Sequence, residues 1–289
     1  MSTGVLGKQV EYPKCYSPDV LEAVPRYLNR EIYGIREEQL PFCGVDVWHA
    51  YELSFLTLKG LPVTGVLKMV IPCNSPFLVE SKSLKLYLNS FNMEQYGDTP
   101  CDGLAIILNH IRQDVERLLK CSVKLSFFDK MDDAPKYDFG DYLLLEYDDS
   151  VQNTIFTHYT ETPELLEGNL IHRNEIKVGT HLLRSNCKIT RQPDWGSAFI
   201  CIKGARIPAY DSLLRYIVSI RNENHFHEEI CEMIYQRLWT LFEPDQLMVA
   251  CIYTRRGGLD ISPVRSSCPE LHPNFLLNPD VMTMKLLRQ

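Results

Sequence analysis

The order in which the hydrophobic spacing changes along this chain constrains its fold more than any other feature. In the first half, residues 48–57 and 63–71 alternate or run apolar over strand lengths, with turn-forming residues between them. Residues 81–91 and 103–119 then place apolar side chains three and four positions apart, as amphipathic helices do. Residues 121–128 alternate again. This half therefore predicts a hairpin, a pair of helices and a closing strand.

The second half repeats that order. Residues 181–189 and 197–203 are predicted strands, residues 211–220 and 227–241 are predicted amphipathic helices, and residues 247–253 are a predicted closing strand. The repetition predicts an α+β protein made of two similar units in tandem, each an antiparallel sheet with two helices packed on one face.

An aspartate-rich stretch, residues 129–150, separates the halves. With 289 residues the chain is long enough for two modest cores. Clustered like charges favour solvent, so we expect a surface connection there. We therefore predict two domains, residues 1–135 and 136–289, with the acidic connection in the second.

Composition narrows the class of function. The net charge is −7 and the basic residues are interspersed among acidic ones, which argues against direct nucleic-acid binding. No stretch approaches the roughly 18 apolar residues of a spanning helix, and residues 1–8 lack a secretory pattern, so we expect a cytoplasmic protein without membrane contact. The ten cysteines are scattered without a Cys-x-x-Cys pair, which predicts reduced thiols and no metal site.

Cys187 is followed seven positions later by Asp194, which lies between a proline and a tryptophan. A thiolate attacks an electrophilic carbon when its surroundings lower the thiol pKa, and a buried carboxyl group can protonate the product. The pair suggests a nucleophile with its own proton donor. The alternative is a buried structural thiol and a turn carboxylate.

Two predicted helix starts carry polar residues suited to a ligand. At the first, Ser81 or Ser83 is a candidate N-cap, and Lys82 and Lys85 near the helix N-terminus could bind a nucleotide phosphate or simply be surface charges.

At the second helix start, Glu228 follows Phe226 and His227. Glu228 and Glu80 could accept hydrogen bonds from the N–H edge of a guanine-like ring, while Phe226 packs on its face. The alternative is an ordinary helix start, with Glu228 near the positive end of the dipole.

The run Arg255-Arg256-Gly257-Gly258 follows a predicted strand and is either a plain glycine turn or part of a phosphate site. The dinucleotide fingerprint Gly-x-Gly-x-x-Gly is absent, so a nicotinamide cofactor would bind through scattered cations such as Lys82 and Arg256. We interpret the Trp48 segment as a core strand.

Taken together, these segments resemble a known family over nearly the whole chain. The matching runs, in order, are Gly44-Val45-Asp46-Val47-Trp48, Glu80-Ser81-Lys82-Ser83-Leu84-Lys85, Ser185-Asn186-Cys187, Gln192-Pro193-Asp194-Trp195-Gly196, Phe226-His227-Glu228 and Arg255-Arg256-Gly257-Gly258-Leu259-Asp260. They resemble the NADPH-dependent 7-cyano-7-deazaguanine reductases of queuosine biosynthesis, in their long two-domain form. The resemblance implies tandem tunnelling-fold (T-fold) domains.

The resemblance also implies an activity and its residues. Cys187 would add to the nitrile of 7-cyano-7-deazaguanine to form a covalent thioimide, Asp194 would protonate the nitrogen, and His227 would assist. NADPH would then reduce the thioimide to 7-aminomethyl-7-deazaguanine, a step in tRNA modification. By position, the resemblance also assigns substrate binding to Val79, Glu80, Ser81, His227 and Glu228, and it assigns NADPH binding to Ser81, Lys82, Arg256 and Gly257. A homodimer with the site at the domain junction and without metal is implied.

Two residues depart from the family pattern. Arg191 stands where glycine usually precedes Gln-Pro-Asp, and Lys188 replaces a frequent proline, which bears on the conformation of this loop. Two other functions stay open. One is a zinc-dependent cyclohydrolase using His227, Cys231 and Cys187, and the other is a purine-binding module without catalysis.

Overall fold

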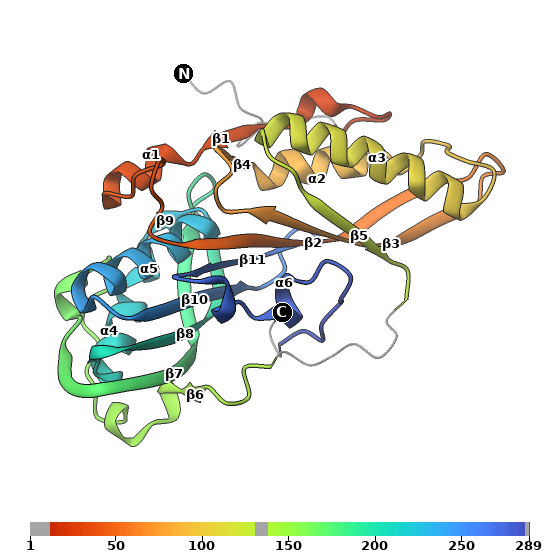
Figure 1. Cartoon of the computed structure of the whole chain (residues 1–289). Coiled ribbons are helices and arrows are strands. Elements are labelled where there is room, and N and C mark those ends of the chain that lie inside the picture. Colours follow the sequence, from red (N-terminus) through yellow and green to blue (C-terminus); the bar gives the residue numbers. More distant parts are fainter. Residues whose placement is uncertain (1–11, 131–137, 287–288) are drawn as a thin grey trace.

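A single mixed sheet runs through the whole molecule. The computed structural model describes residues 12–130, 138–286 and 289 (Figure 1). Among these, the strands of the main sheet follow the order β5-β3-β2-β11-β10-β8-β7-β6, and β9 pairs with β7. Neighbours are antiparallel except where β6 and β9 lie parallel to β7. The α+β class with an antiparallel sheet is thus confirmed.

The predicted order of elements is confirmed in both halves. The first half contains β2 (Cys43–Leu56), β3 (Pro62–Pro72), α2 (Ser81–Asn89), α3 (Pro100–Leu119) and β5 (Lys124–Phe128). The second contains β7 (Gly168–Cys187), β8 (Pro193–Pro208), α4 (Tyr210–Ser219), α5 (His227–Phe242) and β10 (Gln246–Tyr253). Shorter elements are β1 (Ala23–Pro25), α1 (Tyr27–Arg30), β4 (Phe77–Val79), β6 (Leu143–Leu144), β9 (Asn224–His225) and α6 (Asn274–Leu277).

The longest of the strands that were missed is β11 (Leu259–Ser266), and it joins the two halves. It pairs with β10 on one side and with β2 on the other, for example Asp260 opposite His49. Its sequence alternates polar and apolar residues and contains Pro263, which argues against a central strand. The sheet is therefore continuous across the halves. The expected boundary at 135/136 falls in residues 131–137, outside the described part of the chain.

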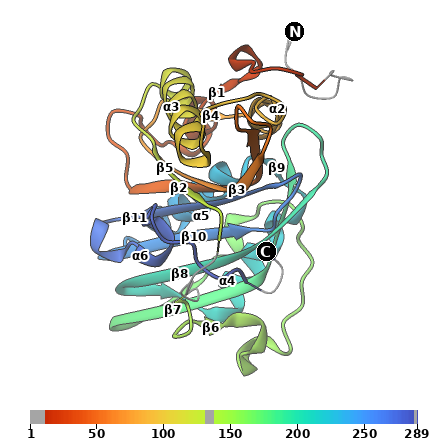
Figure 2. The ribbon, with the colours of Figure 1, turned by 90° about the vertical axis from the view of Figure 1, so that its right-hand side faces the viewer.

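Helices cover one face of the sheet in two groups. α2 and α3 pack on β2 and β3 around Leu53, Leu84 and Ile111, and α4 and α5 pack on β7, β8 and β10 around Leu213, Ile234 and Val249. In Figure 1, α2 and α3 lie above β2 and β3, whereas α6 and the C-terminal segment lie below them. Figure 2 gives the same arrangement from the side. The sheet therefore has a helix face and an opposite face.

A buried ionic network ties α1, β2, β11 and α5 together. Arg26 and Arg265 both pair with Asp46, at 2.5 and 2.8 Å. Arg265 and Arg30 both pair with Glu232, at 2.8 and 2.7 Å. Because each of these buried charges has a partner of opposite sign, the network fixes α5 against the sheet without leaving a lone charge.

Candidate active site

A small cavity lies on the helix face where the two halves meet. It measures about 20 Å³, and a water-sized probe needs roughly 10–15 Å³, so a bicyclic base enters only if side chains move. Its lining comes from both halves: Trp48, Val79, Ser81, Cys187, Asp194, His225, Phe226, His227, Glu228, Arg256 and Ile261. The cavity thus brings together seven residues that the sequence had proposed for one site: Val79, Ser81, Cys187, Asp194, His227, Glu228 and Arg256.

Cys187 ends β7 and begins a tight turn. The Cys187 N–H donates to the Gln192 carbonyl at 2.8 Å, and the Arg191 N–H donates to the Cys187 carbonyl at 2.9 Å. Arg191 closes this turn with φ = 56°, in the left-handed region that favours glycine. The loop thus keeps the conformation that a glycine would adopt more easily, and the departure at Arg191 leaves the turn intact.

The surroundings of the Cys187 thiol favour ionisation. Burial raises its pKa, but hydrogen bonds from the Thr190 hydroxyl, from the backbone N–H groups of Thr190 and Ile189 and from Arg256 outweigh it. The net effect lowers the pKa of Cys187. Such a thiol is a better nucleophile near neutral pH than an ordinary buried cysteine.

Asp194 contacts two cationic or proton-carrying groups. Its Oδ1 lies 2.7 Å from Nη1 of Arg256, and its Oδ2 lies 3.4 Å from Nε2 of His227. The His227 ring stacks on Tyr253, with centroids 3.8 Å apart and 7° between the planes. The stack holds the imidazole next to Asp194, in a position suited to passing a proton.

Lys188, the second departure from the family pattern, connects the cysteine turn to the start of α5. Its ammonium lies 2.7 Å from Oε1 of Glu229 and 5.5 Å from the centroid of the Phe226 ring. The other oxygen of Glu229 accepts from the Phe226 N–H at 3.0 Å and so caps the helix. Lys188 therefore supports the segment that presents Phe226, His227 and Glu228 to the cavity.

Glu228 is 3% exposed and is the least satisfied acid of the site. Burial, and next the nearby charge of Asp46, raises the pKa of Glu228 to about 8. Its Oε1 and the Trp48 Nε1 are buried without a hydrogen-bond partner among the described residues. Buried polar atoms normally have partners, so these two atoms point to a ligand that supplies a donor and an acceptor. The sequence had favoured a core role for Trp48 over a ligand role, and the structure places it in the cavity lining.

Unlike Glu228, Glu80 has hydrogen-bond partners within the chain for both of its carboxylate oxygens. Its carboxylate caps α2, accepting from the Lys82 N–H at 2.9 Å and the Ser83 N–H at 2.7 Å. The cap is thus Glu80 and not Ser81 or Ser83, as the alternative interpretation had it, because a glutamate at this position reaches both free N–H groups. Glu80 is buried beside the cavity lining without belonging to it.

Of the residues expected to bind NADPH, Ser81 and Arg256 line the cavity, whereas Lys82 and Gly257 do not. Ser81 lines the cavity, Lys82 follows it on α2, and Arg256 and Gly257 lie in the β10–β11 turn. Gly257 has φ = 61°, and a Cβ there would meet only the Lys85 side chain within 4 Å. Cations around an open glycine turn form a donor set that fits phosphate groups.

The zinc arrangement does not form in the described residues. Cys231 faces the sheet, where its thiol donates to the carbonyls of Val249 and Pro263, both at 3.5 Å. It is fully buried and does not line the cavity that contains Cys187 and His227. Within the described residues no group of three or more His, Cys, Asp or Glu could hold a metal ion.

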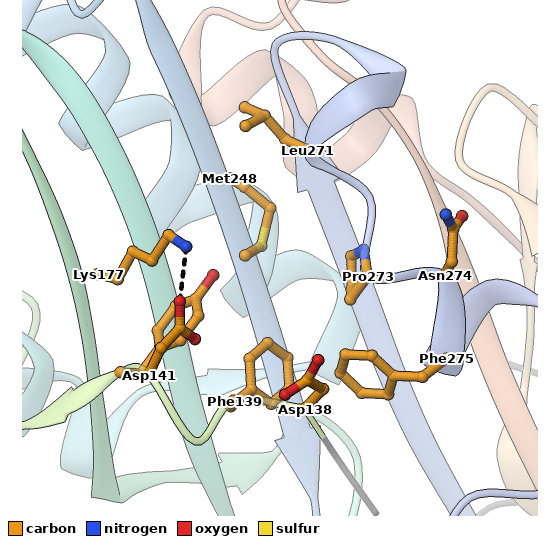
Figure 3. Close-up of a pocket in the computed structure, with 10 residues that line it drawn as sticks. Asp138, Phe139, Asp141, Lys177, Met248, Leu271, Pro273, Asn274 and Phe275 are labelled. Atoms are coloured by element: carbon orange, nitrogen blue, oxygen red, sulfur yellow. Dashed lines mark hydrogen bonds and ion pairs between the residues drawn. The ribbon is translucent and has the colours of Figure 1, made fainter. Parts of the chain in front are cut away.

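A much larger cavity lies elsewhere, on the opposite face of the sheet (Figure 3). It measures about 900 Å³ and is bordered by Met248, Phe275 and the ion pair of Lys177 with Asp141, at 2.6 Å. Among the described residues its lining contains no cysteine, serine or histidine, so it lacks the thiol and the imidazole that the small cavity combines. Size therefore does not identify the site here, whereas the chemistry of the lining does.

In the described part of the chain, no helix has the length and apolar character needed to span a bilayer.

The fold and the small cavity define a class: an α+β protein in which a low-pKa thiol, a carboxylate, a histidine and a buried glutamate converge at the junction of its halves. Comparison with known proteins specifies it further. The family model "Nitrile reductase, 7-cyano-7-deazaguanine-reductase N-term" matches residues 12–127, and "QueF-like protein" matches residues 193–271.

Curated relatives match almost end to end. NADPH-dependent 7-cyano-7-deazaguanine reductases of Delftia acidovorans and Chromohalobacter salexigens are each 40% identical, over 93% and 94% of this chain and 94% of each relative. The reductase of Paracidovorax citrulli is also 40% identical, over 93% of this chain and 94% of its own. An apo crystal structure of the archaeosine synthase QueF-Like aligns with 15% identity and a TM-score of 0.30, over 34% of this chain and 95% of that one. The chain belongs to the family of NADPH-dependent 7-cyano-7-deazaguanine reductases.

Proposed function

We propose that this protein reduces 7-cyano-7-deazaguanine to 7-aminomethyl-7-deazaguanine with NADPH, through a thioimide on Cys187. The observation that carries the proposal is the shared cavity of Cys187, Asp194 and Glu228, in a chain that belongs to this family. The lowered pKa of Cys187 supports its role as the nucleophile.

The covalent step balances without an added reagent. Sγ of Cys187 bonds to the nitrile carbon, one carbon–nitrogen π bond breaks, and the nitrogen takes up a proton. The Cys187 thiol releases this proton as it ionises, and Asp194, which lies beside Arg256 and His227, would pass it to the nitrogen. His227, next to Asp194, supplies the protons needed later in the reduction.

Substrate recognition follows from the unsatisfied atoms of the cavity. Glu228 would accept from the N–H edge of the deazaguanine, which gives its lone buried oxygen a partner. Phe226 would stack on the ring, and Val79 and Ser81 would border it. Glu80 would act beside them through the cap that fixes the start of α2.

The cofactor site is assigned to Ser81, Lys82, Arg256 and Gly257, whose charges and open turn suit a dinucleotide phosphate. Two NADPH molecules, bound one after the other, would each supply one of the two hydrides that a nitrile needs to become an amine, and the carbon–sulfur bond to Cys187 would break between the two reductions. Because Arg256 pairs with Asp194, a phosphate that draws Arg256 toward itself would also free the carboxylate. Cofactor binding and proton transfer would then be linked through one side chain.

The architecture and cellular role belong to the same proposal. The two helix-and-hairpin units would be tandem T-fold domains, divided near residue 135, and the protein would act as a cytoplasmic homodimer in queuosine biosynthesis. The order of elements in each half and the family membership support this assignment.

The test follows NADPH absorbance after 7-cyano-7-deazaguanine is added to the purified protein. We expect two NADPH to be consumed per nitrile, none in Cys187→Ala, and a strongly reduced rate in Asp194→Asn. Cys231→Ala is the matched control, because this buried thiol lies outside the cavity, and it should retain activity. Substrate binding by the parent without NADPH consumption would instead identify a purine-binding module.

A further inference from the structure

A second group of buried ionisable side chains lies on the opposite face of the sheet. His49 on β2 and Asp260 on β11 are cross-strand neighbours, both at most 1% exposed. Nδ1 of His49 lies 2.7 Å from Oδ1 of Asp260, and the Tyr51 hydroxyl donates to Oδ2 of Asp260 at 2.5 Å. Nothing in the proposed reaction uses these three residues.

Lys285 completes this group from the C-terminal segment. Its ammonium lies 3.1 Å from Oδ2 of Asp260 and 3.0 Å from Nδ1 of His49. It also lies 5.7 Å from the centroid of the Tyr51 ring. Burial lowers the pKa of Lys285, so the ammonium depends on Asp260 to remain charged there. Asp260 is fully buried and Lys285 is 16% exposed, so removing Lys285 leaves a buried carboxylate with one partner fewer.

The C-terminal segment that carries Lys285 is itself fixed to the sheet. Nζ of Lys68 on β3 donates to the carbonyls of Asn278 and Val281, at 2.7 and 2.8 Å. The Ser126 hydroxyl donates to Asp280 at 2.9 Å. The segment therefore crosses β5, β3 and β2 on the opposite face and brings Lys285 to Asp260 on β11.

Asp260 and Tyr51 also hold the turn assigned to NADPH. Asp260 follows directly on the turn that Arg256 and Leu259 close by exchanging backbone hydrogen bonds, at 2.9 and 3.2 Å. The Tyr51 N–H donates to the Gly258 carbonyl at 2.9 Å. The Arg255 guanidinium lies 4.6 Å from the centroid of the Tyr51 ring.

The two adjacent arginines of this turn have different partners. Arg255 lies over Tyr51 on the opposite face, whereas Arg256 pairs with Asp194 at the cavity. Since Tyr51 contacts Arg255, Gly258 and Asp260, any loosening of Asp260 is passed to the turn.

We propose that Lys285 is a positioning residue for the cofactor-binding turn, acting from the C-terminal segment through Asp260 and Tyr51. The proposal rests on the proposed function for its ligand. Without Lys285, Asp260 loses a partner, the hold on Tyr51 weakens, and Gly257 and the backbone of the turn are placed less well for a phosphate, while Arg256 stays paired with Asp194. Small displacements of positioned groups can cost up to about a hundredfold in rate or affinity.

The test measures NADPH binding directly by calorimetry, together with KM and kcat, for Lys285→Met and Lys285→Arg. We expect the methionine variant to raise the NADPH Kd and KM about tenfold, with kcat and the rate of thioimide formation changed less than about twofold. The arginine variant should restore most of the affinity. Lys177→Met is the matched control, since Lys177 pairs with Asp141 on the same face, away from the turn.

An unchanged NADPH affinity in Lys285→Met overturns the inference, as does an equal loss of thioimide formation, which would indicate general damage. If Lys285→Met does not fold, Tyr51→Phe tests the same link from the sheet side. It removes the bond to Asp260 and should weaken NADPH binding about threefold, and no change would overturn the inference. A parent that binds NADPH but reduces no nitrile contradicts the proposed function instead, and the binding comparison remains valid.

Discussion

Glu228 and Glu232 lie one turn apart on α5, each is 3% exposed, and their pKa values move in opposite directions. Burial raises both. For Glu232, Arg265 and Arg30 outweigh burial and lower the pKa to about 2. For Glu228, burial and Asp46 dominate and raise the pKa to about 8. Burial sets the same cost at both positions, and the neighbouring charges decide which form is stable.

The difference separates an acid that the fold satisfies from one that it leaves unsatisfied, for which we proposed a substrate-binding role. Glu232 has its partners within the chain, and it stabilises the fold by joining α5 to β11 and α1. Glu228 has an oxygen without a partner in the described residues, and it faces the cavity. A buried acid that the fold leaves unsatisfied is available to a ligand. Burying it without a partner lowers the stability of the folded protein, and a ligand that bonds to it restores that loss.

The largest effect should come from breaking the paired acid. Glu232→Gln leaves the buried Arg30 and Arg265 short of a counter-charge, and we expect it to lower the free energy of unfolding by about 3–5 kcal/mol. Urea unfolding at neutral pH measures this. Glu37→Gln is the matched control, since Glu37 also pairs with Arg30 but is a third exposed, and it should cost under about 1 kcal/mol. Equal effects of the two variants would contradict the comparison.

Glu228→Gln should act in the other direction. The folded protein holds the Glu228 proton up to about pH 8, whereas the unfolded chain releases it near its ordinary value, so the stability of the parent falls as pH rises between them. The variant lacks this fall. We expect its free energy of unfolding to match that of the parent near pH 5 and to exceed it near pH 8 by on the order of 3 kcal/mol. The variant should also bind 7-cyano-7-deazaguanine far more weakly. Parallel pH–stability curves for the two proteins would refute this.

A smaller effect tests whether hydrogen-bond partners also set the pKa of the Cys187 thiol. Thr190→Val removes the side-chain hydrogen bond to Cys187, so the thiol pKa should rise, and the pH profile of alkylation by iodoacetamide should move to higher pH. Thioimide formation near neutral pH should slow about tenfold. Thr190→Ser keeps the hydroxyl and should follow the parent profile. An unshifted profile in the valine variant would exclude Thr190 from this role.

The smallest effect concerns backbone strain. Arg191 has φ = 56°, and glycine adopts such angles without a Cβ clash. Arg191→Gly should raise the free energy of unfolding by up to about 1 kcal/mol, seen as a higher Tm, with the alkylation profile of Cys187 unchanged. Lys120→Gly, at φ = 54° in a turn far from the cavity, should show a similar gain. A loss of stability in the Arg191 variant would mean that its side chain holds the turn.

Much of the fold could be predicted from local pattern. The strands and helices of both halves appeared in order, because apolar spacing reflects which face of an element is buried. The start of β7 at Gly168 and the end of β8 at Pro208 were not predicted. There the two strands pair with each other through the backbone, which the spacing of apolar side chains does not record. β11 was missed for a similar reason, because its polar side chains have buried partners that are remote in sequence.

The sequence by itself determined the residue types of the site and their order, including Cys187, Asp194, His227 and Glu228. Only the tertiary structure decided their partners. It paired Arg256 with Asp194, placed Arg255 over Tyr51, made Glu80 the cap of α2, and paired Lys285 with Asp260. The physical reason is that pKa values and hydrogen-bond satisfaction depend on charges and burial contributed by distant segments, which local spacing does not record.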